Sequence, residues 1–302
     1  MAMNDTIPDE VKTLVIPSPD SHKGQNGRLL IIGGSSLFHA ASIWSLTVAS
    51  RIVDLVHYCS TPENNHIIHE LKKEFQNGIV IPREDVDAYI QEDDVILIGP
   101  GMTRDEETKM LTDRLLKQYS DKQWVIDAGA LQMMDLSNIP KHAILTPHHQ
   151  EFELLQKRAL VANENLDASS VPTNISPAMQ SLRGSEAAQN FIRSQRDDVL
   201  EFAKSHNCIV LLKGKEDMTS NGKEVCRIEG GNAGMTKGGT GDVLAGLIAA
   251  LACTNDPWKA TIAGSYINKR AGDELYQTVG PFFNATDLSN QIPKTMKTLL
   301  FF

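Results

Sequence analysis

Short apolar runs alternate with longer amphipathic stretches over most of the chain. The apolar runs are continuous instead of alternating with polar residues, which is typical of strands buried on both faces of a parallel sheet. They span residues 29–32, 55–58, 79–81, 95–98, 124–126, 143–145 and 209–212. Apolar residues recur at helical spacing in residues 40–52, 63–75, 105–119 and 196–205. This order predicts an α/β fold in which helices cover both faces of a largely parallel central sheet.

The last third of the chain follows a different pattern. Residues 218–219 and 225–228 flank the turn residues Ser220, Asn221 and Gly222, which predicts a hairpin after Lys213. Helices are predicted over residues 243–253, 257–278 and 285–299, with Pro257 suited to a first helical turn. Residues 161–194 are rich in Asn, Ser, Pro and Ala. We interpret them as the mobile part of an irregular insertion, residues 156–195, in a single domain of residues 1–302.

Composition and charge narrow the class of protein. With 302 residues, 41% hydrophobic and 22% charged, the chain has the composition of a soluble globular protein. A net charge of -9 without a basic cluster argues against a nucleic-acid partner. No signal peptide and no apolar run of membrane-spanning length is found, and the four cysteines have no paired spacing. We therefore expect a cytoplasmic protein with reduced cysteines, no membrane association and no protein-bound metal.

The run GGNAGMTKGGTGDVLAGLIAA, residues 230–250, is the strongest sign of chemistry. Six glycines fall within residues 230–241 and an apolar helix follows, so Gly239, Thr240 and Gly241 lie at a helix N-terminus. Free N–H groups and the helix dipole favour phosphate there. A carboxylate at Asp242 would repel that phosphate, so its presence there indicates a chemical role. Accepting a hydroxyl proton during phosphoryl transfer is such a role. The alternative, a glycine-rich turn that only caps a core helix, accounts for fewer of these features.

Polar and glycine-rich segments follow five of the predicted strands. Because the carboxyl ends of parallel strands meet at one edge of a sheet, these segments predict a cleft there. They are Gly33-Gly34-Ser35-Ser36, Gly99-Pro100-Gly101, Asp127, Thr146-Pro147-His148-His149 and Lys213-Gly214. The signatures of P-loop enzymes, dinucleotide-binding domains and serine hydrolases are missing. His66 and His69 have helical spacing but no third ligand nearby, which favours a solvated helix face.

Together these motifs resemble the ADP-dependent NAD(P)H-hydrate dehydratases, which are ribokinase-like enzymes with a three-layer α/β/α sandwich. The chain resembles a stand-alone form, without the epimerase domain to which many members are fused. The matching segments are collinear over roughly residues 24 to 290. They are GGS with Phe38 and Ala40, GPG at 99–101, VIDA at 125–128, LTPH with Glu151, LLKG at 211–214, and GNAGMTKGGTGDVLAG.

The resemblance implies a reaction and a set of site residues. With Mg2+ as cofactor, the terminal phosphoryl group of ADP, or of ATP, is transferred to the hydroxyl of the hydrated nicotinamide ring. Loss of phosphate then restores NADH or NADPH. With ADP the other product is AMP. Asp242 is then the catalytic base and contacts the hydrate, together with Ala40, Gly101 and His148. The adenine nucleotide would be held by Lys213, Gly214, Lys215, Glu216, Asp217, Gly239, Thr240 and Gly241. We also expect a homo-oligomer, with a tetramer as the form to test.

Several positions depart from the family pattern. His39 replaces a usual Gly, Gly129 an Asp, Gln132 an Asn, and Asp217 a common Thr, while His149 and Gln150 replace Pro-Gly. Two rival functions follow: a small-molecule kinase for a vitamin precursor, and a non-catalytic nucleotide-binding protein of the same fold. LTPH and GMTKGGTGD together favour the dehydratase over the kinase, and an intact GGTGD sequence argues against a non-catalytic protein. The sequence does not decide whether ADP or ATP is the phosphoryl donor, or whether the hydrate of NADH or that of NADPH is the preferred substrate.

Overall fold

The computed structural model describes residues 7–164 and 186–301, and a nine-stranded sheet forms its centre. The strand order is β3-β2-β1-β4-β5-β6-β7-β8-β9. Strands β1 to β7 are parallel, and β8 is antiparallel to both β7 and β9. The sequence prediction is confirmed, since each predicted strand in β1–β7 has bounds within one residue of those observed. The strands are β1 (Arg28–Ile32), β2 (Leu55–Cys59), β3 (Ile79–Ile81), β4 (Val95–Ile98), β5 (Gln123–Ile126), β6 (Ile144–Leu145), β7 (Ile209–Leu212), β8 (Asp217–Ser220) and β9 (Val225–Ile228).

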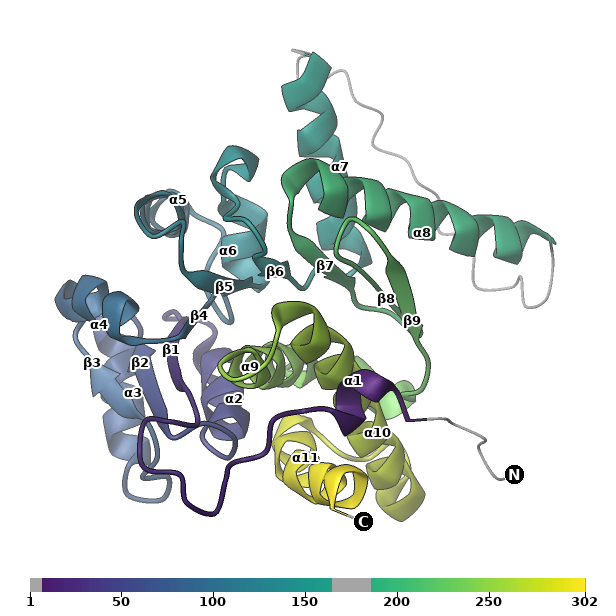
Figure 1. The fold of residues 1–302 in the computed structure, drawn as a ribbon. Helices are drawn as coiled ribbons and strands as arrows, with labels where there is room; N and C mark the ends of the chain where they lie inside the picture. Colours follow the sequence, from purple (N-terminus) through teal and green to yellow (C-terminus); the bar gives the residue numbers. More distant parts are fainter. Residues whose placement is uncertain (1–6, 165–185, 302) are drawn as a thin grey trace.

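Helices connect the strands and form the end of the chain (Figure 1). Every predicted helix is present, whereas α1, α4, α6 and α7 were not predicted. The helices are α1 (Asp9–Lys12), α2 (His39–Ala49), α3 (Pro62–Leu71), α4 (Val86–Glu92), α5 (Glu106–Gln118), α6 (Ala128–Met133), α7 (His149–Glu164), α8 (Glu186–His206), α9 (Thr240–Ala252), α10 (Pro257–Val279) and α11 (Ala285–Leu300). Short 3-10 turns are η1 (Arg83–Asp85), η2 (Leu136–Asn138) and η4 (Ala233–Thr236).

The segment interpreted as irregular is helical at both of its described ends. Helix α7 continues to Glu164, and α8 begins at Glu186, ten residues before the predicted start. Glu, Gln, Arg and Ala dominate these ends and have high helix propensity, so low apolar density did not prevent helix formation. Residues 165–185 lie outside the described part of the chain. The mobility expected there stays a prediction.

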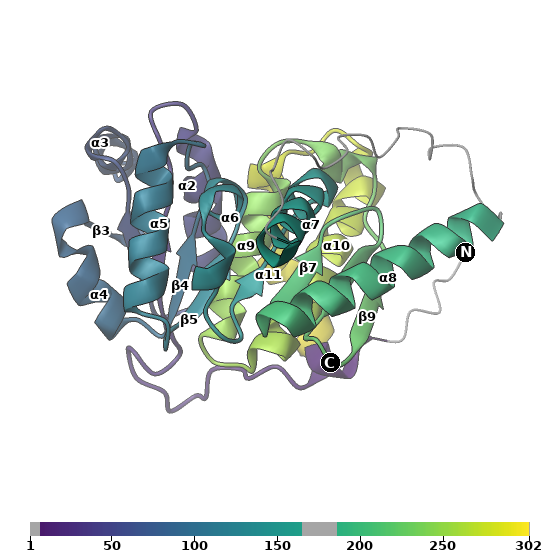
Figure 2. The ribbon, with the colours of Figure 1, turned by 90° about the horizontal axis from the view of Figure 1, so that it is seen from above.

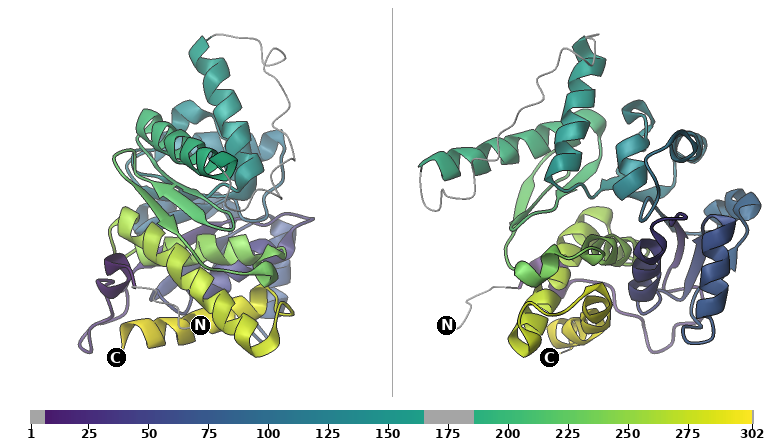
Figure 3. Two further views of the ribbon diagram at one scale, coloured as in Figure 1. Left: turned by 90° about the vertical axis from the view of Figure 1, so that its right-hand side faces the viewer. Right: turned by 180° about the vertical axis from the view of Figure 1, so that it is seen from behind.

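Two hydrophobic cores lie on opposite faces of the sheet, because successive strand side chains point to opposite faces. On one face Leu29, Ile31, Val95 and Leu97 pack with α2, α9, α10 and α11. On the other, Leu30, Ile32, Ile96 and Ile98 pack with α4 to α8. The sheet therefore lies between two helical layers (Figure 3), and α5 to α8 cover it when seen from above (Figure 2).

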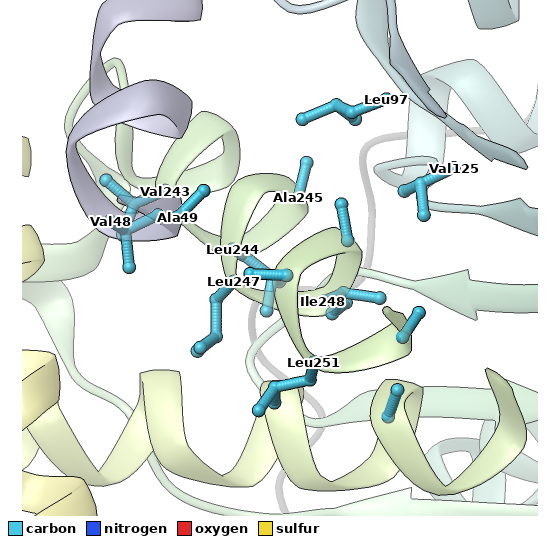
Figure 4. Close-up of a cluster of buried hydrophobic side chains, with 14 of the residues drawn as sticks. Val48, Ala49, Leu97, Val125, Val243, Leu244, Ala245, Leu247, Ile248 and Leu251 are labelled. Carbon is cyan, nitrogen blue, oxygen red and sulfur yellow. The ribbon is translucent and has the colours of Figure 1, made fainter. Parts of the chain in front are cut away.

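Helix α9 is the central helix of the first core. Its residues from Val243 to Ala252 are buried, and they lie between Val48 and Ala49 of α2 and the strand residues Leu97 and Val125 (Figure 4). This explains its uninterrupted apolar run, since a helix that is apolar on all sides must be buried. The core thus fixes the position of the glycine-rich turn at the start of α9.

Two smaller expectations can be compared with the described residues. His66 and His69 lie on an exposed face of α3, as predicted. The four cysteines are free thiols, and burial raises the pKa of Cys59 and Cys208 to about 12. Within residues 7–164 and 186–301, no helix combines the length and the apolarity that crossing a membrane requires.

Candidate functional site

Gly239 and the hydroxyl group of Thr240 fix the first turn of α9, which has no side-chain cap. Gly239, the N-cap, has a φ of 95°, and a Cβ there would lie 2.3 Å from the ring of Trp44. The Thr240 hydroxyl donates to the carbonyl oxygens of Met235 at 2.7 Å and Lys237 at 3.0 Å. The first N–H groups of a helix have no intrahelical acceptor and attract anions. The predicted glycine turn at a helix N-terminus is therefore present, and its binding of an anion stays a prediction.

Two cavities lie on either side of this turn. The larger has a volume of about 660 Å³ and the smaller about 510 Å³. The larger is lined by Lys213, Gly214, Lys215, Asp217, Gly230, Gly231, Asn232, Ala233, Met235, Thr236, Thr240, Gly241, Leu244, Asn268 and Lys269. The smaller is lined by Leu37, Phe38, Ala41, Gly101, Met102, Thr103, Arg104, Ala128, Gly129, Gln132, Glu151 and Asp242. Gly241 and Asp242 are consecutive residues, so the first turn of α9 borders both cavities.

Asp242 has an unusual protonation equilibrium. Burial raises the pKa of its carboxyl group to about 7, and the nearby carboxylates of Asp127 and Glu151 act in the same direction. The ammonium group of Lys213 opposes them but does not cancel them. A carboxylate with a pKa near neutrality is well suited to accept a proton in a reaction, because it can lose that proton again.

Lys213 brings a positive charge to the anion-binding turn. Its Nζ donates to Asp127 Oδ1 at 2.8 Å, and the Thr146 hydroxyl donates to the same oxygen at 2.8 Å. Burial lowers the pKa of Lys213, but the carboxylates of Asp127, Glu151 and Asp242 outweigh it, so the net pKa is raised. A Cβ on Gly241 would lie 3.5 Å from this Nζ. A protonated lysine therefore lies beside the point where a phosphoryl group would bind.

The first turn of α7, which follows β6, contributes Glu151 to the smaller cavity. The N–H of His148 donates to Glu151 Oε2 at 2.8 Å, and the Gln132 amide donates to Oε1 at 2.8 Å. The side chain of His148 is 47% exposed, and its backbone pairs with Lys213. Gln132, a departure from the family pattern, thus holds a carboxylate of the cavity in place.

The two glycine turns after β1 and β4 pack against each other. A Cβ at Gly99, whose φ is 121°, would lie 1.8 Å from the Asp127 carbonyl oxygen. The N–H of Gly34 donates to the Pro100 carbonyl at 2.7 Å, and Gly33 and Gly34 are both buried. Gly33 and Gly34, which belong to one of the segments that predicted the cleft, line neither of the two cavities. These glycines allow close backbone packing, and the following Leu37 and Phe38 line the cavity instead.

Most of the predicted site residues do come together. Lys213, Gly214, Lys215, Asp217, Thr240 and Gly241 line the larger cavity, and Gly101 and Asp242 the smaller. Four others do not line either cavity. They are Gly239, packed under Trp44; Glu216, paired with Arg227 at 2.8 Å; the exposed Ala40; and His148.

Sequence reasoning missed several lining residues, of which Lys269 is the most unexpected. It lies on a face of α10 where Ile262 and Ser265 are also buried, and it is itself 5% exposed. A lysine at helical spacing with buried residues was a signal that could have been used. The departure at Gly129 also has a physical reason, since a Cβ there would lie 2.2 Å from the Met102 carbonyl oxygen.

Comparisons with known proteins are consistent with this geometry. The family model described as NAD(P)H-hydrate dehydratase matches residues 29–294. The bifunctional NAD(P)H-hydrate repair enzyme Nnr of Methanocaldococcus jannaschii is 33% identical over 300 residues, 95% of this chain and 52% of that protein. The ADP-dependent (S)-NAD(P)H-hydrate dehydratase of Cenarchaeum symbiosum is 31% identical, covering 96% of this chain and 95% of that one. The chain spans about half the length of the bifunctional relatives.

Solved structures share the fold. A ribokinase-like superfamily protein from Enterococcus faecalis has a TM-score of 0.74 at 23% identity, over 97% of this chain and 94% of that chain. The ADP/ATP-dependent NAD(P)H-hydrate dehydratase of Bacillus subtilis, co-crystallized with ATP/Mg2+, has a TM-score of 0.74 at 23% identity. The match covers 99% of this chain and 100% of that chain. The expected ribokinase-like α/β fold is confirmed.

Proposed function

The chain belongs to the NAD(P)H-hydrate dehydratase family, and we propose that it is itself a dehydratase, a carbon–oxygen lyase that repairs hydrated NADH or NADPH at the expense of an adenine nucleotide. ADP is the nucleotide named for the relative from Cenarchaeum symbiosum, and both ADP and ATP are named for the enzyme of Bacillus subtilis. The observation that carries the proposal is the position of Asp242. It follows the anion-binding Gly241 directly and lines the other cavity.

The geometry supports an in-line phosphoryl transfer. The nucleotide would bind in the larger cavity, with its terminal phosphoryl group at Gly241 and Lys213, and the hydrated nicotinamide in the smaller cavity. The Asp242 carboxylate would accept the proton of the ring hydroxyl as its oxygen attacks the terminal phosphorus, and AMP would leave if the donor is ADP. The helix N–H groups and Lys213 would stabilise negative charge on the transferring group.

Elimination would complete the dehydration. The ring carbon–oxygen bond breaks, inorganic phosphate leaves with the bonding electrons, and the neighbouring ring carbon loses a proton as the double bond forms. Phosphate is a far better leaving group than hydroxide, which is the chemical reason for the first step. The net result is hydrate plus ADP giving NAD(P)H, AMP and phosphate.

Magnesium would enter with the nucleotide. Among the residues that the structure describes, no three His, Cys, Asp or Glu side chains are grouped so that they could hold a metal ion. Magnesium is commonly bound through substrate phosphates with few carboxylates, so the donor set fits an ion carried by the nucleotide. When bound, it would offset phosphate charge.

The direct test is to incubate the protein with chemically hydrated NADH, Mg2+ and ADP, and to follow reduced nicotinamide by absorbance and AMP by chromatography. We expect equimolar NADH and AMP, and none without nucleotide. Repeating the assay with ATP and with NADPH hydrate assigns the preferred substrates. A phosphorylated hydrate that accumulates without NADH would favour the kinase, and nucleotide binding without turnover would favour a non-catalytic protein.

The remaining parts of the proposal can be tested separately. We propose that Ala40 and His148 contact the hydrate from the edge of the smaller cavity, and that Glu216 and Gly239 act on the nucleotide through the loops they belong to. We also propose a homo-oligomer, such as a tetramer. Light scattering coupled to size-exclusion chromatography measures the mass directly, and a monomer would overturn that part of the proposal.

A further inference from the structure

The ammonium group of Lys269 lies in a cage of oxygen atoms. Its Nζ is 3.1 Å from the carbonyl oxygens of Gly214 and Lys215, 3.3 Å from that of Gly230, and 3.2 Å from Asp217 Oδ1. The residue is 5% exposed although it lines the larger cavity. An ammonium group has three N–H donors, and four protein oxygens already surround it. Lys269 therefore has no donor left for a phosphate group.

The cage joins two loops that are separate in sequence. Gly214 and Lys215 lie in the turn between β7 and β8, whereas Gly230 follows β9. Both loops line the larger cavity. The stem of Lys269 also lies against the second loop, since Cβ atoms added to Gly230 and Gly231 would each lie 3.5 Å from it. One side chain thus fixes the distance between two walls of the cavity.

Asp217 completes the arrangement. Its Oδ1 accepts the N–H of Gly214 at 2.9 Å besides facing Lys269, and its Oδ2 accepts the Ser265 hydroxyl at 2.7 Å. The residue is 4% exposed. A buried charge is strongly unfavourable unless it is paired and hydrogen-bonded, and here each charge supplies the other's partner. Asp217 is also a position where this chain departs from the Thr of the family pattern.

We propose that Lys269 and Asp217 form a clasp, an ion pair that holds the Gly214–Lys215 and Gly230 loops in register for the nucleotide. Lys269 is then a positioning residue that shapes the cavity without touching the phosphates, and Asp217 acts through Lys269 and Gly214. The inference rests on the proposed function in one respect, namely that the larger cavity is the nucleotide site.

Chemical rescue tests the clasp. The variant Lys269→Ala removes the ammonium but leaves its cage of oxygen atoms, and we expect ADP affinity, measured by calorimetry, to fall about tenfold or more, the scale of lost hydrogen bonds to a charged group. Methylammonium can refill the cage and should restore most of the affinity. Tetramethylammonium has no N–H donor and should not restore it.

Lys259→Ala is the matched control, because Lys259 lies on the same helix and donates to the Thr13 carbonyl, outside the cavity. Its ADP affinity should be unchanged.

Hydrogen exchange in the nucleotide-free protein separates the clasp from the proposed function. In Lys269→Ala the amides of residues 214–216 and 230–231 should exchange faster than in the native protein, and methylammonium should slow them again. Unchanged exchange in both loops, or a loss of ADP affinity that methylammonium leaves as it is, would overturn the clasp. A native protein that does not bind ADP would instead contradict the nucleotide site, while the exchange data would still decide the clasp.

Discussion

Two opposing electrostatic effects meet at Asp242. A helix N-terminus stabilises a carboxylate by about 0.3–1 kcal/mol, up to about 2 kcal/mol when partly buried. Burial and the charges of Asp127 and Glu151 act the other way and dominate, since the pKa is raised to about 7. The base is therefore poised for proton transfer, and its ionisation destabilises the folded state.

The stability of the protein should reflect this conflict. The pKa of Asp242 is about 7 in the folded protein, against an ordinary value of 3.8 for an aspartate side chain. The protonated group therefore stabilises the fold below about pH 4, and that contribution is lost as pH rises to about 7. Asp242→Asn should be more stable than the native protein at pH 8, by on the order of 1–3 kcal/mol, with a smaller difference at pH 5. Denaturant unfolding at both pH values measures this. A variant that is less stable at pH 8 would contradict the pKa assignment.

Gly241 offers a test of the anion-binding turn. A side chain there would grow toward the Lys213 ammonium, into the space proposed for the phosphoryl group. Gly241→Val should weaken ADP binding about tenfold or more, a loss of about 1.4 kcal/mol or more. Gly238→Val is the control, because among the described residues, its chain neighbours aside, no atom lies within 4 Å of a Cβ at that position. Equal ADP affinity of the two variants in calorimetry would count against the turn as a phosphate site.

At this scale the sequence predicted which residues line the cavities better than it predicted the contacts of their side chains. Asp242, Gly241 and Lys213 were identifiable because glycines and a strand end surround them. The position of Glu216 beside Arg227, and of Lys269 among the backbone carbonyls of its cage, depends on groups that are distant in the sequence. Local spacing can indicate that Lys269 is buried, but it does not contain the identity of these partners.

At the scale of elements, the packing of α9 on α2 fixes the site. Gly246 is the point of closest approach, since a Cβ there would lie 2.6 Å from Ser45 Cα and 2.7 Å from its carbonyl oxygen. The Ser45 hydroxyl donates to the Asp242 carbonyl at 2.7 Å. The same contact therefore packs the core and orients the first turn of α9.

Gly246→Ala should test this contact. The added methyl group meets backbone atoms that cannot rotate away, so the helices must separate, at a cost of about 1–3 kcal/mol in unfolding free energy. Gly238→Ala, on the open side of the same glycine run, should change stability by about 0.5 kcal/mol or less. Urea denaturation measures both. A Gly246→Ala variant as stable as the native protein would mean that α2 and α9 are not in close contact.

Element prediction succeeded for the strands and most of the longer helices and failed for α1, α4, α6 and α7. Strands buried on both faces form continuous apolar runs that are easily recognised. Helix α6 follows a strained start, with Ala128 at a φ of 46°, and only six residues form it. Helix α7 begins directly after the Thr-Pro-His segment and lacks a strong apolar stripe, so its pattern resembled a loop.

At the scale of the whole molecule, the residues of the candidate site lie together at the carboxyl edge of the sheet. The ends of β4, β5 and β7 contribute Gly101, Asp127 and Lys213. Helix α7, which follows β6, contributes Glu151, and α9 brings Asp242 to them. The sequence predicted this gathering, because parallel strands share one edge. It did not predict two cavities with Asp242 at their boundary, which depends on how α9 lies across the sheet.

A continuous sheet with a core on each face also bears on domain organisation, and we propose a single domain with an insertion near residues 156–195. The described part of the chain should then unfold in one cooperative transition, seen alike by tryptophan fluorescence and circular dichroism. ADP at about 100 times its Kd should raise the unfolding free energy by about 2.7 kcal/mol. Two separated transitions, of which ADP shifts only one, would indicate two domains.

The central claim is that Asp242 is the base between a nucleotide site and a hydrate site, and a single-turnover experiment with Asp242→Asn tests it most directly. Enzyme in excess over hydrated NADH is mixed with ADP and Mg2+, and NADH and AMP are quantified over time. We predict that the variant binds ADP within about threefold of the native affinity, since Asp242 lines the other cavity. Its turnover should fall by about 10²–10⁴-fold or more. A variant that forms NADH and AMP at close to the native rate would contradict the account.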